Sequence, residues 1–156
     1  GLQSLSVSEN DLDSAGGVAL GSSLAALSLL LSLDIGGNGM GSEGGAAIAA
    51  ALPSLPALHT FIAWDNSFGP EVGSALGAAL GGLTALRVLN LYKNEFGPEA
   101  GRAIADGIAG RSSLVGLDIS HNGIGDEARE RLGVEWSHLG EWKSAGADST
   151  GFDNAN

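Results

Sequence analysis

Residues 86–97, LRVLNLYKNEFG, hold the pattern that decides the fold. Leu89 and Leu91 are separated by one residue, and side chains along a strand point alternately to its two faces, so both lie on one face. Asn94 then stands where the strand would end, and Phe96 supplies one more apolar side chain two residues later. The stretch therefore predicts a short strand with one buried face, followed by a turn.

The same pattern returns every 28 residues along the chain. The repeated asparagines are Asn10, Asn38, Asn66, Asn94 and Asn122. The apolar residues five positions before them are Leu5, Leu33, Phe61, Leu89 and Leu117. Ten and fourteen positions after each asparagine, apolar residues recur with the spacing of one helix face. Because one strand and one helix cannot bury two apolar faces alone, the repeats must stack on one another.

Each predicted helix begins with a recognisable signal. Pro70 and Pro98 occupy a first-turn position, where the missing N–H of proline is tolerated. Ser14, Ser42 and Asp126 are cap-type residues at the same place in other repeats. Glycines that would let neighbouring repeats pack closely follow in the first turn: Gly44, Gly45, Gly73 and Gly101. The sequence thus predicts one helix after each strand.

The pattern LxxLxLxxN, followed by an apolar residue and a helix, resembles the leucine-rich repeat family. At 28 residues per copy it is most similar to the longer strand-plus-helix repeats of ribonuclease inhibitor. The resemblance covers Leu2 to about Leu132 in five copies. It implies an α/β leucine-rich repeat solenoid, curved, with a parallel inner sheet and outer helices. It also implies binding of other proteins on the inner face and its rims.

The sequence predicts that the chain is divided into two structural segments. Residues 1–139 are expected to form one leucine-rich repeat domain of five repeats, part of a longer array, because no cap precedes Leu2 and the first strand would expose its core edge. Residues 140–156 are expected to form a degenerate C-terminal capping repeat and tail. Trp142, Ala145, Ala147 and Phe152 fall at the repeated apolar positions of this segment, and Thr150 falls at the position of the asparagine. An acidic tail without fixed structure is the alternative interpretation.

Outward positions on the predicted inner face supply a candidate binding site. Trp64 and Tyr92 occupy equivalent positions on strands about 5 Å apart, so their rings are expected to be adjacent and exposed. Aromatic residues with a polar rim are typical of a binding hot spot. The candidate protein-binding residues are Ile62, Trp64, Asp65, Asn90, Tyr92, Lys93, Asp118 and His121. The alternative is a pair of aromatics that cover strand edges on a surface without a partner.

The net charge of −11 is unevenly distributed. All seven Lys and Arg residues follow residue 86, whereas the first 86 residues carry seven acids. Nucleic acid is therefore not a predicted partner, since phosphate neutralisation needs clustered cations, and a basic protein surface fits better. No apolar run approaches the roughly 18 residues of a membrane-spanning helix, so membrane insertion is not predicted. The absence of cysteine is compatible with an intracellular location.

No catalytic residue, cofactor or metal is predicted. Residues 39–44, GMGSEG, match the glycine pattern of dinucleotide-binding turns. However, Met40 belongs to the same apolar column as Phe68 and Phe96, and Glu43 would oppose a phosphate at the helix start. The three histidines have no partner at metal-ligand spacing, and no arrangement typical of a Ser-His-Asp triad occurs.

The sequence therefore predicts a non-catalytic protein–protein interaction or scaffold module that binds its partner through the concave sheet face. Two alternatives stay open. The chain could be a structural accessory subunit, held in a larger assembly that covers its N-terminal edge. It could also be a regulator, either an enzyme inhibitor or a small-GTPase activator, which the family resemblance alone suggests.

Overall fold

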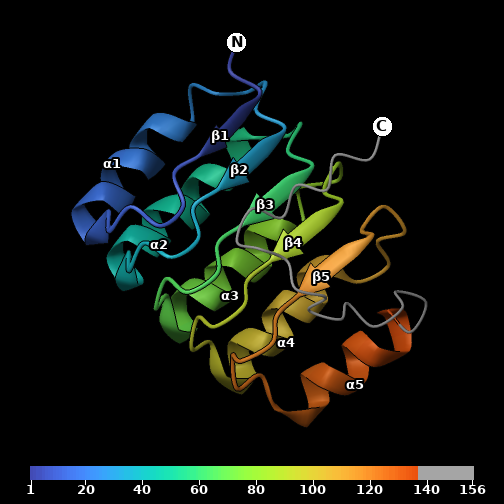
Figure 1. The fold of residues 1–156 in the computed structure, drawn as a ribbon. Coiled ribbons are helices and arrows are strands. Elements are labelled where there is room, and N and C mark those ends of the chain that lie inside the picture. The colour runs from blue at the N-terminus through green and yellow to red at the C-terminus, as the bar shows by residue number, and fades with distance from the viewer. Residues whose placement is uncertain (137–156) are drawn as a thin grey trace.

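The computed structural model describes residues 1–136 of the chain, so the capping repeat predicted at 140–156 lies outside the described residues. In this part, five strands form one parallel sheet whose spatial order follows the sequence, with the helices along one side of it (Figure 1). The strands are β1 (Ser4–Ser6), β2 (Ser32–Asp34), β3 (Thr60–Ile62), β4 (Val88–Asn90) and β5 (Gly116–Asp118). The helices are α1 (Asp13–Leu24), α2 (Gly41–Ala51), η1 (Leu52–Ser54), α3 (Gly69–Leu80), α4 (Gly97–Ile108) and α5 (Gly125–Trp136). The predicted α/β solenoid is confirmed.

The register of the sheet is set by the repeat length. Every paired residue lies 28 positions from its partner, as in Leu33 with Phe61 and Phe61 with Leu89. These inward residues are 0% exposed and meet the helices in one continuous core. Phe68 and Phe96 fill the space behind each turn, also without exposure. The apolar columns read from the sequence are therefore the core of the molecule.

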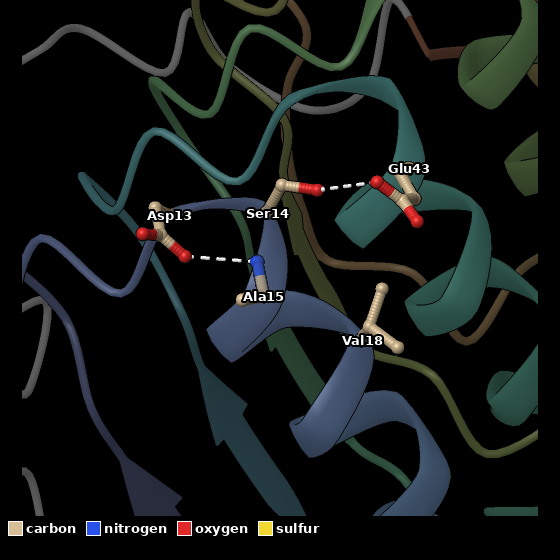
Figure 2. A pocket seen from close by; sticks show the side chains of 5 residues that line it. All are labelled: Asp13, Ser14, Ala15, Val18 and Glu43. Carbon is tan, nitrogen blue, oxygen red and sulfur yellow. Dashed lines mark hydrogen bonds between the residues drawn. The ribbon is translucent and has the colours of Figure 1, made fainter.

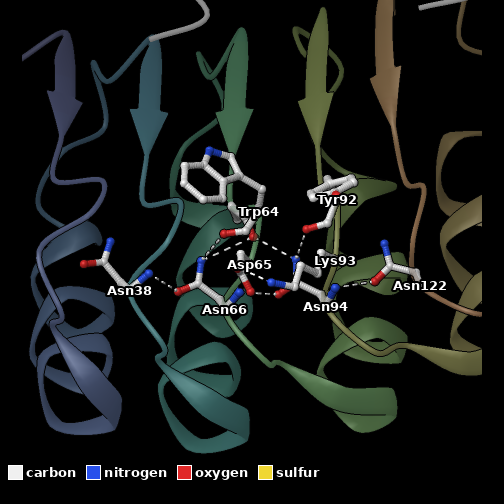
Figure 3. A network of polar contacts seen from close by, with 9 residues as sticks. Asn38, Trp64, Asp65, Asn66, Tyr92, Lys93, Asn94 and Asn122 are labelled. Atoms are coloured by element: carbon white, nitrogen blue, oxygen red, sulfur yellow. Dashed lines mark hydrogen bonds and ion pairs between the residues drawn. The ribbon is translucent and has the colours of Figure 1, made fainter. Parts of the chain in front are cut away.

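A row of buried asparagines joins neighbouring repeats where the strands end (Figure 3). The Oδ1 atom of Asn66 accepts the Asn38 N–H at 3.3 Å. Its Nδ2 donates to the carbonyls of Ile35 at 3.0 Å, Ala63 at 3.3 Å and Trp64 at 3.0 Å. One side chain thus pairs backbone groups of two repeats that would otherwise be buried without partners.

The turns around this row use left-handed backbone. In every repeat the residues directly before, directly after and three after the asparagine have φ between +48° and +76°. Glycine fills some of these positions, but eight are not glycine: Glu9, Asp11, Asp13, Asp65, Ser67, Lys93, Glu95 and His121. A side chain in this conformation costs about 1–2 kcal/mol, which the surrounding hydrogen bonds must offset.

Adjacent helices pack closely in two pairs, α1 with α2 and α3 with α4. A Cβ added to Gly17 would lie 2.7 Å from the Gly44 Cα atom, and one added to Gly77 would lie 2.4 Å from the Ala103 carbonyl carbon. Between α2 and α3 the contact is looser, and side chains such as Phe68 fill it. Glycines therefore set the approach of the helices; Gly44 is one of those predicted to do so, whereas Gly17 and Gly77 were not predicted.

The helix starts agree with the prediction for Pro70 and Pro98, which lie in the first turns of α3 and α4, but not for the serines. No helix from α1 to α4 has a hydrogen bond from a side chain at its N-cap position. The Ser14 hydroxyl instead donates to the Glu43 carboxylate of the next repeat at 3.0 Å (Figure 2). The Ser42 hydroxyl donates to the Phe68 carbonyl, also in the next repeat. In α1 the Asp13 carboxylate accepts the Ala15 N–H at 2.8 Å. The capping role assigned to the serines was wrong, because Ser14 and Ser42 lie inside the first turn, one residue after α1 and α2 begin.

One repeated apolar position holds a cation in place of leucine before the fifth strand. Arg111 stands where Leu55 and Leu83 stand in earlier repeats. Its guanidinium donates to the carbonyls of Leu80, Gly81 and Leu83, each at 2.5 Å. Partial burial lowers the pKa of Arg111. The cation therefore neutralises the negative end of α3.

None of the helices in residues 1–136 combines the length and the apolar character needed to cross a membrane.

Candidate protein-binding site on the inner sheet face

The eight predicted site residues lie on three neighbouring repeats. Ile62, Asn90 and Asp118 are register partners on β3, β4 and β5. The other five lie in the turns that follow these strands. The structure therefore brings all eight to the same end of the inner face, where the strands run into the asparagine row.

Trp64 lies against the preceding repeat (Figure 3). A Cβ added to Gly36 would stand 2.2 Å from the indole Nε1, and one added to Gly37 would stand 2.8 Å from Cη2. The half-buried indole thus covers two glycines, and any larger residue there would displace it. Sequence reasoning missed this contact, although Gly36 and Gly37 hold equivalent positions to Trp64 and Asp65 one repeat earlier.

Tyr92 contacts the following repeat. The centroids of the Tyr92 and His121 rings are 4.9 Å apart, and the angle between the ring planes is 62°. This is the edge-to-face arrangement that aromatic pairs prefer. The sequence predicts Trp64 as the neighbour of Tyr92, but the structure gives each ring another partner. The site is therefore two separate aromatic contacts on adjacent repeats, and both rings are half-buried.

Three of the predicted residues support the strands. Ile62 is only 8% exposed, so the expectation that it adds to an exposed apolar surface was wrong. The side chains of Asn90 and Asp118 each accept the N–H two residues later, from Tyr92 at 3.0 Å and Ser120 at 3.0 Å. These bonds fix the backbone that carries Tyr92 and Ser120.

Asp65 and Lys93 form an exposed ion pair on the rim. The Lys93 Nζ lies 2.8 Å from the Asp65 carboxylate, and both residues have left-handed backbone. The hydrogen bond to Asp65, with the charge of that carboxylate, raises the pKa of Lys93. Water screens such a pair, so it adds little to stability. Because both groups are exposed, each of them can form an ion pair with an opposite charge on a partner instead.

Asp34 is a buried carboxylate that is not among the eight predicted site residues. It is 3% exposed and accepts the Gly36 N–H at 3.1 Å. Burial raises the pKa of the Asp34 carboxyl, while hydrogen bonds from Gly36, Ser8 and Ser6 oppose the shift. Burial therefore disfavours the charged form of Asp34, and the hydrogen bonds compensate this only in part.

Asp34→Asn is expected to stabilise the protein at pH 7 by about 1 kcal/mol, the scale of one poorly compensated buried group. The amide keeps an acceptor for the Gly36 N–H, as Asn90 does in repeat four. Because the folded pKa is raised, the native state binds more protons than the unfolded state above pH 3.8, and stability falls as pH rises towards the folded pKa. Thermal melts at pH 3 and pH 7 should show the gain at pH 7 only.

Asp118→Asn is the control for this prediction, since it makes the same charge change at the equivalent, half-buried position. Its effect should stay within about 0.5 kcal/mol at both pH values. Equal gains from the two variants would show that net charge, and not burial of Asp34, limits stability.

The described residues hold little that suggests small-molecule chemistry. The hollow between α1 and α2 is lined by Asp13, Ser14, Ala15, Val18 and Glu43 (Figure 2). Its two carboxylates are occupied by the hydrogen bonds already given. Within residues 1–136, His, Asp and Glu do not gather into a group of three that could hold a metal ion.

Comparison with protein families identifies the class of the protein. The Leucine Rich repeat family matches residues 2–21, 26–49, 82–105 and 112–133, more than half of the chain. With five parallel strands alternating with helices, the chain belongs to the leucine-rich repeat family. Repeats of this family generally mediate protein–protein interaction and are typically non-catalytic. A search of curated proteins found no match to the chain.

Proposed function

We propose that this protein is an interaction or scaffold module that binds a protein partner through its inner face, with Trp64, Tyr92 and the rim charges as the main contacts. The observation that carries the proposal is the pair of aromatic contacts set on adjacent repeats. Both rings are held by neighbouring groups before any partner arrives. A preorganised aromatic contact loses less entropy on binding, so more of its burial appears as affinity.

The third repeat supports this assignment. Residues 50–81, which include β3 and Trp64, are not among the stretches that the family matches. Phe61 and Ala63 replace the leucine and the branched or long apolar residue of other repeats. A repeat that departs from the common pattern and also carries the tryptophan is a reasonable place for a specialised contact.

The charge distribution supports a partner with a basic surface. The first 86 residues carry seven acids and no Lys or Arg. Complementary charge would speed association, and added salt should slow it. The 28-residue repeat length supports the ribonuclease inhibitor-like variety, and the cysteine-free sequence supports an intracellular location.

The test begins with crosslinking mass spectrometry on native material to identify the partner. Its affinity is then measured for Trp64→Ala and Tyr92→Ala, each expected to weaken binding at least tenfold, or about 1.4 kcal/mol. Val115→Ala is the control, because Val115 is 63% exposed and lies outside the site. Full affinity in both aromatic variants, with unchanged melting temperatures, would contradict the proposal.

A structural-subunit role is the second candidate. Leu2 and Leu29 are 46% and 57% exposed, and Gly1 lies against Leu29. These residues lie at the β1 end of the described sheet, where a neighbouring subunit would cover them. Crosslinks concentrated at this end would favour the subunit role over inner-face recognition. If the partner is an enzyme, a stoichiometric change in its rate would identify the module as a regulator.

A further inference from the structure

The indole of Trp64 rests on the preceding repeat with the face of its ring and not with an edge. A Cβ added to Gly36 would lie 2.2 Å from Nε1, 2.4 Å from Cε2 and 2.6 Å from Cδ1. Such similar distances to three ring atoms describe a point above the ring plane, because a point beyond the edge at Nε1 would be clearly farther from both carbons. Figure 3 shows the indole reaching from β3 towards the repeat of β2. The opposite face of the ring therefore points away from the backbone, towards the inner surface.

Glu9 of the first repeat reaches the same indole. A Cβ added to Gly37 would lie 2.8 Å from Cη2 of Trp64 and 3.3 Å from Cγ of Glu9. The Glu9 side chain and the six-membered part of the indole thus flank one point, and the carboxylate is one bond beyond the Cγ atom. Glu9 is exposed. Its charge is therefore accessible beside the ring.

The negative charge near the indole has no cation to balance it in the described part of the chain. Asp34 accepts the N–H of Gly36, the residue that the indole covers, and the charge of Glu9 is one cause of the raised pKa of Asp34. The ion pairs among residues 1–136 include neither carboxylate. Residues 1–86 contain no Lys or Arg. A cation from another molecule would relieve the repulsion between Glu9 and Asp34.

The geometry also favours one shape of cation. The negative face of an aromatic ring attracts a cation placed over it, and tryptophan does so most strongly. A guanidinium can lie flat on the indole while its N–H groups extend past the ring edge, where Glu9 lies. An ammonium is a compact charge, so it cannot stack on the ring and reach the edge in the same way.

We propose that the open face of Trp64 and the carboxylate of Glu9 bind an arginine side chain of the protein partner. The guanidinium stacks on the indole and donates to Glu9, while Asp34 adds negative charge nearby. Gly36 and Gly37 contribute by letting the indole lie flat on their backbone. This assignment rests on the proposed function, because it names the group that the inner face recognises.

The test is a titration of the full chain followed by the NMR signal of the Trp64 Nε1–H, which Trp64→Phe identifies by its loss. The probes are the peptide acetyl-Gly-Arg-Gly-amide and the same peptide with citrulline or lysine at its centre. The arginine peptide should shift this signal saturably. Citrulline keeps the shape and loses the charge, so it should bind at least about fivefold more weakly. Lysine should bind at least about twofold more weakly than arginine.

Glu9→Gln should weaken binding of the arginine peptide at least about threefold, because it removes the carboxylate and keeps the size of the side chain. Glu99→Gln is the matched control. It removes the same charge from the first turn of α4, in the helical layer, and should leave the affinity within about twofold of the parent, since distant exposed charges are screened.

The proposal would be overturned if the arginine peptide gave no saturable shift, or if citrulline bound as tightly as arginine. Equal losses in Glu9→Gln and Glu99→Gln would overturn it in favour of net charge alone. Lysine that bound as tightly as arginine would overturn the choice of a guanidinium.

These outcomes are separable from the test of the proposed function. If the arginine peptide failed to bind while Trp64→Ala still weakened partner binding, only the arginine assignment would fall. If the peptide bound as expected while Trp64→Ala and Tyr92→Ala kept full affinity for the partner, the proposed function would fall instead.

Discussion

Replacing Asn66 by alanine is expected to lower the free energy of unfolding by about 3–5 kcal/mol, the range for breaking a buried hydrogen-bond network. The variant removes the acceptor of the Asn38 N–H and the donor of three carbonyl groups. The bonds to Asn38, Ile35 and Ala63 are buried, so these groups would lose their partner without access to bulk water. Urea unfolding followed by circular dichroism would measure the loss.

Asn10→Ala is the matched control. Asn10 holds the same position in the first repeat, but it is exposed, and its amide donates only to Val7 and Ser8. Its replacement should cost less than about 1 kcal/mol, as for a solvated hydrogen bond. If both variants lost the same stability, local turn geometry would matter more than the buried row between repeats.

Gly77→Ala is expected to destabilise the protein by about 2–3 kcal/mol, the usual scale of overpacking. The added methyl group would lie 2.4 Å from the carbonyl carbon and 2.5 Å from the oxygen of Ala103. Backbone atoms cannot rotate away as a side chain can, so α3 and α4 must separate. The loss should exceed the gain in helix propensity that alanine brings, about 1 kcal/mol.

Gly82→Ala provides the comparison for this variant. The nearest atom to its added Cβ is the Ala79 oxygen at 3.6 Å, an ordinary contact. Its melting temperature should equal or slightly exceed that of the parent, because alanine restricts the unfolded chain. Scanning calorimetry on both variants would decide the matter, and a Gly77→Ala protein as stable as the parent would show that the two helices separate easily.

The sequence was a good guide to the sheet and the core, and the physical reason is periodicity. A residue such as Leu89 is buried because its column is apolar in every repeat, and the 28-residue interval sets its pairing with Phe61. The asparagine column was also predictable, since strand ends need donors and acceptors. The hydrogen bonds of the serines at the helix starts were not predictable, because the bonding of Ser14 depends on Glu43 in the next repeat.

The candidate site was predicted less completely. Its residues were chosen by their outward columns, and their positions on the inner face follow from the register. The position of a residue in the repeat does not determine the direction in which its side chain points. Trp64 turns towards the preceding repeat because glycines there leave space, and the burial of Asp34 depends on several repeats together.

The close pairing of α3 with α4 also shapes the surface that a partner would meet. Strands in a sheet stay about 4.8 Å apart, so the arc of a solenoid bends most where the outer layer is widest. The contact of Gly77 with Ala103 narrows that layer behind β3 and β4, whereas α2 and α3 pack less extensively behind β2 and β3. Trp64 and Tyr92 therefore follow two strands whose helices are packed tightly together, so a partner laid across both would meet a surface that resists deformation.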